Sequence, residues 1–232
     1  MLEVVIGDVH ARADLLRAVL GSSGVLDSRG RRREDAWVVQ VGDLLDRRAS
    51  LSENLAAASL AADTIDVVLA GNHEARMLDA GAHGPALALL ATRGWPHAAA
   101  ASGGWLITHA GVHPALGAGL PADVSECVAE INDRWWRERA HPLFDWIGPA
   151  RDGEAPHGGL FWLGAGEWPR DLGSPWPQIS GHVPQREPRL LAPGRWSIDV
   201  GRRDRLAALV RCDGGAWRPV MASAHARARV AA

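Results

Sequence analysis

The sequence Val41-Gly42-Asp43-Leu44-Leu45-Asp46-Arg47 places two carboxylates and a guanidinium directly after an apolar run. That run, residues 37–41, predicts a buried strand. Open α/β sheets bind ligands beyond the carboxyl ends of their strands, so Asp43, Asp46 and Arg47 are expected to face such a site. Taken alone, the stretch favours a plain strand end with solvated acids and a surface arginine.

The same arrangement recurs along the chain, where an apolar run ends and a residue able to bind a metal follows. The runs cover residues 4–6, 37–41, 67–70 and 105–108, and a shorter one covers 178–180. Since the carboxyl ends of the strands line one crevice, the residues that follow are expected to converge. These residues are Asp8, His10, Asp43, Asn72, His109 and His182. Mixed oxygen and imidazole donors of this kind suit a pair of divalent transition-metal ions.

One carboxylate shared between two ions holds them about 3.5–4 Å apart and lets them clamp a phosphoryl group. Asp43 is the expected bridge. The first ion is expected to bind Asp8, His10 and Asp43. The second ion is expected to bind Asp43, Asn72, His109 and His182.

Length and composition fit a soluble α/β protein with one domain. The 232 residues are 47% hydrophobic and 22% charged, and the formal net charge of −2 offers no long-range attraction for nucleic acid or anionic membrane. No apolar run could span a bilayer, no signal peptide is evident, and Cys127 and Cys212 match no metal or redox spacing. We therefore expect a cytoplasmic protein whose domain covers residues 1–222, with a disordered tail over 223–232.

Capping signals and turn residues predict the remaining elements. Ser50-Leu51-Ser52-Glu53 resembles a capping box and predicts a helix to about residue 62, and a similar signal at 123–126 predicts one to about 139. Residues 141–177 are rich in Gly, Pro and Trp, and so long an irregular segment is expected at the mouth of the site. Later strands, expected to be antiparallel, cover residues 196–199, 206–211 and 217–220.

Together these motifs resemble the calcineurin-like metallophosphoesterases, and more closely their phosphoprotein-phosphatase branch. The matching segments are residues 7–10, 42–47, 71–74, 109–111 and 181–182, with a late Ile-Asp-x-Gly segment at 198–201. Asp46-Arg47 and Glu74 favour this branch over the phosphodiesterase branches. Two residues depart from the family pattern, because Ala11 and Arg48 stand where glycine is usual. Arg48 either adds charge at the mouth or points outward, and the outward orientation is the one we expect.

The resemblance implies a four-layer α/β-β/α sandwich, in which two mixed sheets pack face to face with helices outside. It also implies two divalent ions, with manganese first and Fe, Zn, Co or Ni as alternatives, and direct attack of a metal-bridging hydroxide on phosphorus. His73, held by Asp46, is expected to protonate the leaving oxygen, and Arg47 to hold the phosphate. A second arginine grips the phosphate in this family, and Arg134, Arg137, Arg151 and Arg170 compete for that place. Arg170 is our prediction.

The substrate is less well defined than the chemistry. The first hypothesis is a phosphomonoesterase acting on phosphoserine, phosphothreonine or small phosphate esters. The second is a bis(5′-nucleosyl)-tetraphosphatase, because residues 109–114 look like bacterial members of that group. A non-catalytic binding module is a third, which the intact set of ligands and His73 disfavours. Outside the motifs, His113 is interpreted as a turn residue, His157 as a surface or loop residue, and Asp199 as either a ligand-orienting residue or a strand end.

Overall fold

β1 (Leu2–Ile6) is buried along its whole length, and so is most of β2 (Ala36–Gln40). Strands buried on both faces need cover on both sides, which is typical of parallel strands in α/β proteins. β1 and β2 pair in parallel, with Val4 opposite Val38. The chain between them includes α1 (Ala13–Ser22), which packs on the same sheet.

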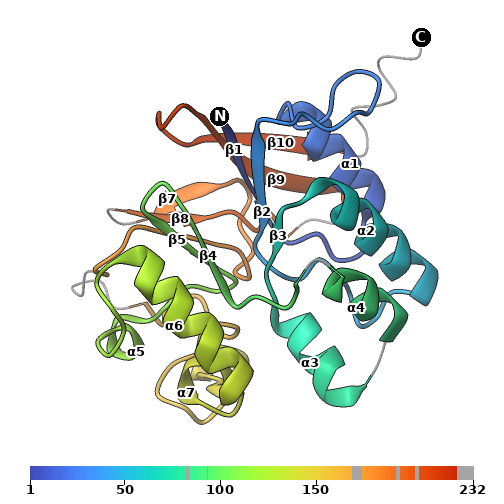
Figure 1. Cartoon of the computed structure of the whole chain (residues 1–232). Helices are drawn as coiled ribbons and strands as arrows, with labels where there is room; N and C mark the ends of the chain where they lie inside the picture. The colour runs from blue at the N-terminus through green and yellow to red at the C-terminus, as the bar shows by residue number, and fades with distance from the viewer. Residues whose placement is uncertain (82–83, 93, 169–173, 192–193, 202–203, 224–232) are drawn as a thin grey trace.

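The computed structural model describes residues 1–81, 84–92, 94–168, 174–191, 194–201 and 204–223. Its strands form two five-stranded mixed sheets, in the orders β10-β9-β1-β2-β3 and β4-β5-β6-β8-β7 (Figure 1). The first sheet also contains β3 (Val67–Val68), β9 (Arg205–Cys212) and β10 (Arg218–Ser223). The second contains β4 (Ala99–Ser102), β5 (Trp105–Thr108), β6 (Gln178–Ser180), β7 (Arg189–Leu191) and β8 (Arg195–Ser197).

Apolar side chains from both sheets form one cluster, so the sheets pack face to face. Val5 and Leu209 enter it from the first sheet, and Ile107 and Ile179 from the second. Helices cover the outer faces (Figure 1). Beside the first sheet lie α1, α2 (Leu51–Thr64), α3 (Asn72–Ala80) and α4 (Gly84–Ala91). Beside the second lie α5 (Pro114–Gly117), α6 (Val124–Arg137), α7 (Pro142–Asp145) and the 3-10 turn η1 (Pro149–Arg151). The expected four-layer α/β sandwich is confirmed.

Local signals predicted several of these elements well. The capping box is present at the start of α2, where the Ser50 amide donates to Glu53 and the Glu53 amide donates to the Ser50 hydroxyl. β8, by contrast, pairs in parallel with β6 and is antiparallel only to β7, so the expectation of purely antiparallel late strands is wrong there. β4 was missed because Ala99-Ala100-Ala101-Ser102 has little β propensity, and its pairing with β5 is a tertiary effect. Except for Ser223, which ends β10, the predicted tail lies outside the described residues.

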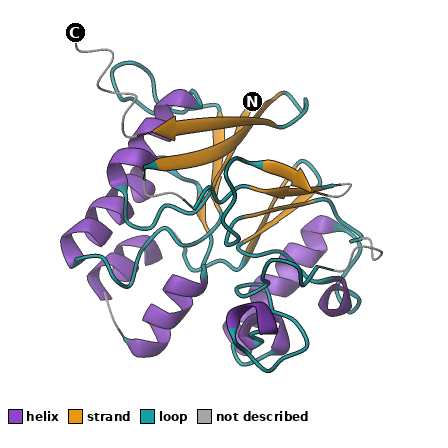
Figure 2. Cartoon of the chain, turned by 180° about the vertical axis from the view of Figure 1, so that it is seen from behind, coloured by secondary structure: helices purple, strands orange, loops and turns teal. Residues whose placement is uncertain are grey.

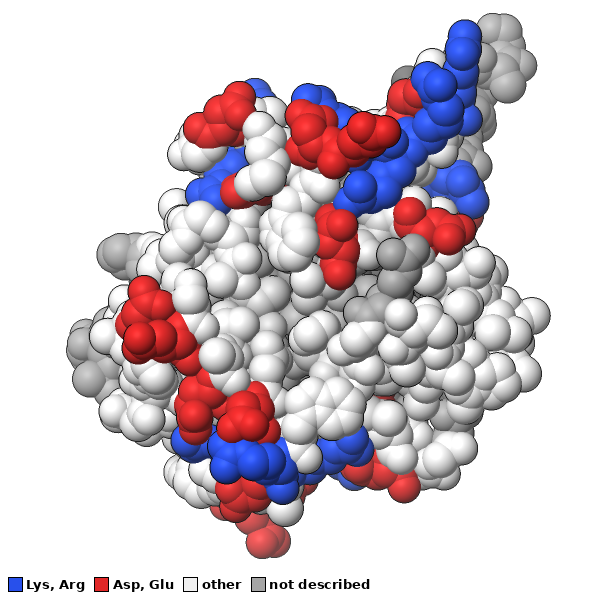
Figure 3. All heavy atoms as spheres, viewed as in Figure 1, with Lys and Arg blue, Asp and Glu red and all other residues white. Residues whose placement is uncertain are grey.

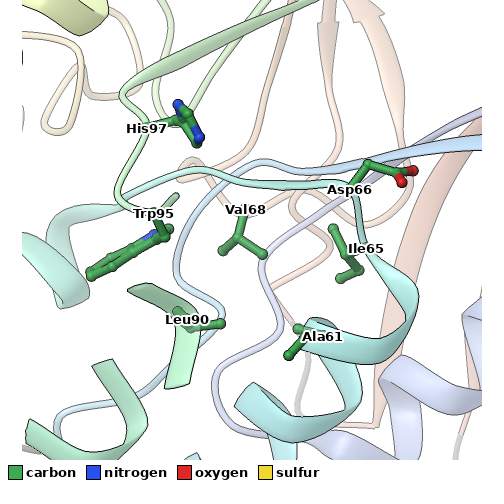
Figure 4. A pocket seen from close by; sticks show the side chains of 8 residues that line it. Ala61, Ile65, Asp66, Val68, Leu90, Trp95 and His97 are labelled. Carbon is green, nitrogen blue, oxygen red and sulfur yellow. The ribbon is translucent and has the colours of Figure 1, made fainter. Parts of the chain in front are cut away.

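A small apolar recess lies between α2, α4 and the chain around β3 (Figure 4). Ala61, Leu90 and Trp95 line it. Its carboxylate, Asp66, accepts the Val38 amide at 2.8 Å and forms an ion pair with Arg32, so both interactions of this group stabilise the fold. The recess therefore offers no free carboxylate among its described residues, and the residues predicted to bind metal lie elsewhere.

No described helix is both long and apolar enough to cross a bilayer. On the face in Figure 3, acidic and basic side chains lie next to one another at the upper and lower edges, and a broad uncharged region separates them. Charges of both signs are therefore present on this face, with a run of basic side chains at the upper right and an acidic group at the left edge.

Candidate active site

The loops that follow β1 and β2 are tied together directly beyond the strand ends. The amides of Val9 and His10 both donate to the Asp43 carbonyl, at 2.9 and 2.8 Å. On the second sheet, the Gly181 amide donates to the His109 carbonyl at 2.7 Å. Figure 2 shows loops filling the region between the two sheets and the helices. Neighbouring strand ends thus deliver their loops to one region, as the sequence predicted.

The structure brings all six predicted metal-binding residues into this region. Asp8, His10 and Asp43 form one group whose candidate ligand atoms lie within 4.8 Å of one another, and Asp43, His109 and His182 form a second. Asp43 belongs to both groups, as a bridging carboxylate would. The sixth residue, Asn72, starts α3 and places its Oδ1 3.0 Å from His109 Nε2.

Burial shifts the pKa values of the carboxylates and imidazoles of the site. It is the largest cause of the raised pKa values of Asp8 and Asp43, and neighbouring carboxylates raise both further. It also lowers the pKa of His10 to about 4 and that of His109 to about 3, so both rings are neutral near pH 7. Neutral imidazoles keep a lone pair for a metal, and a divalent ion would favour the ionised carboxylates.

The hydrogen-bond partners of His109 provide a test of whether a metal fits. Its Nδ1 lies 3.2 Å from the Val41 carbonyl oxygen, which can only accept, so Nδ1 carries the proton and Nε2 carries a lone pair. That lone pair faces two acceptors, Asn72 Oδ1 at 3.0 Å and Asp43 Oδ2 at 3.7 Å. It also lies 3.1 Å from His182 Nδ1, which donates or accepts according to the tautomer of that ring. A cation placed here would attract all of these lone pairs at once. A proton donated to a backbone carbonyl is also the usual way in which a metal-binding histidine is oriented.

Two further atoms support the same interpretation. His10 Nδ1 and His182 Nε2 are buried and have no hydrogen-bond partner among the described residues. Buried polar atoms are nearly always satisfied, and an absent ion is a recognised explanation for an exception. The residues therefore fit a pair of divalent ions.

Backbone strain is concentrated at the same residues. His10, Asp43 and His182 have φ values of 50°, 53° and 65°, in the left-handed region that residues with a side chain rarely adopt. Such conformations cost on the order of 1–3 kcal/mol each and cluster at functional sites. The close approach of the loops also requires glycine, since a Cβ on Gly71 or Gly181 would lie 2.2 or 1.9 Å from a carboxylate oxygen of Asp43 or Asp8.

His73 and Asp46 lie beside the metal-binding groups. His73 Nδ1 is 3.2 Å from Asp46 Oδ1, and the His73 and His10 rings are 5.0 Å apart. Burial lowers the pKa of His73, and the nearby Asp46 carboxylate opposes that change. Asn54 is buried in α2 and holds the backbone of Asp46. Its Oδ1 accepts the Asp46 amide and its Nδ2 donates to the Asp46 carbonyl, both at 2.9 Å. We did not predict Asn54, although a polar residue in an Ala-rich helix was the available signal.

Glu74 is a second positioning residue, whose role the sequence did not show. Its side chain is fully buried, and its two oxygens accept the amides of Asp43, Gly71 and Leu45 at 2.9, 2.9 and 2.7 Å. These amides belong to the loops after β2 and β3. One carboxylate therefore holds together the two loops that carry Asp43 and Asn72.

The described arginines that compete for the second phosphate-binding position lie in different parts of the protein. Arg170 lies outside the described residues, so its expected role stays a prediction. Of its three competitors, Arg134 and Arg137 form ion pairs within α6. Arg151 reaches the site, where its guanidinium donates to the His182 carbonyl at 3.0 Å. Arg47 is exposed, and its amide lies 3.4 Å from His73 Nδ1.

The structure also bears on the expectations for four other residues. Arg48 lines a pocket next to His73, in contrast to the expected outward orientation. His157 lies in a loop, which was one of its two expected places, but it is buried, and its ring stacks on that of His113 with 3.7 Å between centroids. His113 does occupy a turn, where it caps α5 by accepting the Ala115 amide. Asp199 is buried beside the site and accepts the Gly201 amide.

Two facing mixed sheets, with Asp, His and Asn side chains gathered at their strand ends, are typical of metal-binding phosphoester hydrolases. The chain belongs to the calcineurin-like phosphoesterase family, whose model matches residues 4–193. No curated protein matches it.

Solved structures of a cold-active protein tyrosine phosphatase have a similar fold. One, at 17% identity, has a TM-score of 0.58 and covers 94% of this chain and 78% of its own. Another, from a psychrophilic Shewanella species, has a TM-score of 0.56 at 16% identity, with coverages of 94% and 80%. At these identities the likeness concerns the fold alone.

Proposed function

We propose that this protein is a phosphatase of the phosphoprotein-phosphatase branch that hydrolyses phosphomonoesters with two divalent ions. The observation that carries the proposal is the group of lone pairs around His109 Nε2, which suits a cation, together with Asp43, which belongs to two of the three groups of candidate metal ligands among the described residues. Manganese is the first ion to test, because carboxylate and amide oxygens suit it, and Fe, Ni and Zn follow because imidazole suits them.

The ligands are assigned as the sequence analysis predicted. Asp8, His10 and Asp43 hold one ion. Asp43, Asn72, His109 and His182 hold the other. When bound, such a pair supplies a nucleophile at neutral pH and polarises the phosphoryl oxygens.

The protein's own residues bind the phosphoryl group and move a proton. Arg151, anchored on the His182 carbonyl, and Arg47 stabilise the oxygens that gain negative charge in the transition state. His73 donates a proton to the leaving oxygen, and Asp46 keeps its ring oriented and favours the protonated form. Asn54 fixes Asp46 in turn, since it binds both the amide and the carbonyl of that residue.

The test compares substrates in one assay. The metal-stripped chain is reconstituted with Mn²⁺ and given a phosphoserine peptide, a phosphotyrosine peptide and diadenosine tetraphosphate. Phosphotyrosine is included because the structural neighbours are described as tyrosine phosphatases. Release of inorganic phosphate from a peptide supports the proposal, whereas cleavage restricted to the dinucleotide would replace it with a bis(5′-nucleosyl)-tetraphosphatase.

Asp43→Asn is the decisive variant, because the bridging role makes its carboxylate unique. We expect it to lose nearly all activity and to retain less metal at both positions. Elemental analysis and turnover are measured on the same sample. Two ions per chain with native turnover in this variant would overturn the assignment.

A further inference from the structure

A pocket of about 600 Å³ is lined by His73 and by one of the proposed metal ligands, His10. Its lining includes His10, Asp46, Arg48, His73, Pro184 and Gly201. Asp43, His109 and His182 are not among the residues that line it. A volume in this range is that of a small-molecule site.

The charged groups of this pocket differ in what they already bind. Asp46 accepts the Arg48 amide at 2.9 Å and contacts His73. Glu53 accepts the amide and hydroxyl of Ser50 at 2.8 and 2.6 Å, and Asp199 accepts the Gly201 amide at 2.8 Å. The carboxylates that line the pocket are therefore all engaged.

The guanidinium of Arg48 differs from these groups. In the described part of the chain it makes no hydrogen bond and no ion pair. Its backbone is nevertheless held, because the Arg48 amide donates to Asp46 Oδ1. Its positive charge also acts on His73, whose pKa it helps to lower after burial and Arg47. A cation without a partner thus lies on the pocket wall next to the residue proposed as the general acid.

We propose that this pocket binds the leaving group of the substrate, and that Arg48 selects a leaving group carrying a further anionic group. The inference rests on the proposed function, in which His73 protonates the leaving oxygen. A leaving group bonded to that oxygen extends from His73 into the pocket and reaches Arg48.

The ligand chemistry is that of a carboxylate or a second phosphate, because both match the planar fork of a guanidinium. The expected substrate class is therefore a phosphomonoester whose alcohol bears an anionic group a few bonds from the ester oxygen. A phosphoserine beside an acidic side chain and a small bisphosphate both meet this description.

The experiment compares three aryl phosphates whose leaving groups have similar basicity. Phenyl phosphate has an uncharged leaving group, 3-carboxyphenyl phosphate carries a carboxylate, and benzene-1,3-diyl bisphosphate carries a second phosphate. The measured quantity is kcat/KM for each anionic substrate divided by that for phenyl phosphate, so effects common to all substrates cancel. The carboxylate and phosphate arms separately show which anion is preferred.

In Arg48→Gln we expect this ratio to fall roughly tenfold, as for loss of one charge-assisted contact at a partly exposed site. Arg48→Lys, which keeps the charge but not the fork, should lose less. Arg29→Gln is the matched control, because Arg29 is an exposed arginine on a distant loop and should leave the ratio as it is. In the native enzyme the ratio should fall as salt is added.

The outcomes test the leaving-group pocket and the phosphatase function separately. Hydrolysis of phenyl phosphate with a ratio that Arg48→Gln does not change would refute the leaving-group subsite and leave the phosphatase intact. Failure of the native, metal-loaded chain to hydrolyse any of the three esters would refute both. Circular dichroism and metal content, measured on each variant, exclude misfolding as the cause of a loss.

Discussion

Glu74→Gln should weaken metal binding although Glu74 is not itself a proposed metal ligand. Oε2 of Glu74 accepts two amides, from Asp43 and Gly71, and Oε1 accepts the Leu45 amide. A carboxamide has only one acceptor oxygen, and its nitrogen can only donate. In the better of the two orientations the oxygen serves Asp43 and Gly71, and the Leu45 amide is left without an acceptor.

The expected loss of stability and metal affinity follows from the one amide that is left without an acceptor. A buried donor left unsatisfied costs about 1–3 kcal/mol. The site cannot easily relax, because Glu74 is fully buried. Burial also raises the pKa of Glu74, so a neutral side chain recovers part of the desolvation cost of the carboxylate. We therefore expect the free energy of unfolding of the metal-free chain to fall by about 1–2 kcal/mol, and metal affinity to fall about 10–100-fold, as for other residues that orient ligands.

Two measurements test this reasoning. Urea unfolding with a chelator present reports the metal-free stability, and isothermal titration with Mn²⁺ reports the affinity. Glu126→Gln is the control, because that glutamate is exposed on α6. Native affinity together with native stability in Glu74→Gln would refute the positioning role, and lower stability with native affinity would restrict Glu74 to the fold.

Three further predictions concern the acid, the phosphate and pH. His73→Ala should reduce kcat/KM for phosphoserine far more than for 4-nitrophenyl phosphate, since nitrophenolate leaves without a proton; equal losses with metals retained would argue against a general acid. Arg151→Ala should reduce kcat/KM on the order of 10²-fold, with Arg137→Ala, which removes only an ion pair on α6, as the control. Burial and the charge of His157 lower the pKa of His113 to about 4, so the folded state binds fewer protons than the unfolded state, and stability falls as the pH drops from about 6.5 through about 4. His113→Asn keeps a capping acceptor and should make the urea midpoint less dependent on pH in that window; an unchanged dependence would contradict this cause.

The sequence alone determined the class of fold and the set of residues proposed to bind metal. Each of those residues follows an apolar run directly, so its place is set by the strand before it. Neighbouring strand ends meet at one edge of a sheet, so local spacing was sufficient to group these residues within each sheet. The packing of the two sheets then brings His109 and His182 to the residues that follow β1, β2 and β3. The capping box at Ser50 and Glu53 was likewise predictable from local spacing, since its partners are three residues apart.

The residues that position the site were decided by the tertiary structure. Asn54 and Glu74 act on loops through hydrogen bonds that only packing creates, and nothing in their local sequence shows those contacts.

Arg151 belongs to a segment without periodicity, so the sequence offered no basis for choosing it over other arginines. The orientation of Arg48 toward the pocket likewise depends on the turn held by Asp46. Local spacing specifies which groups reach the strand ends, whereas their distances and partners depend on contacts between segments far apart in the chain.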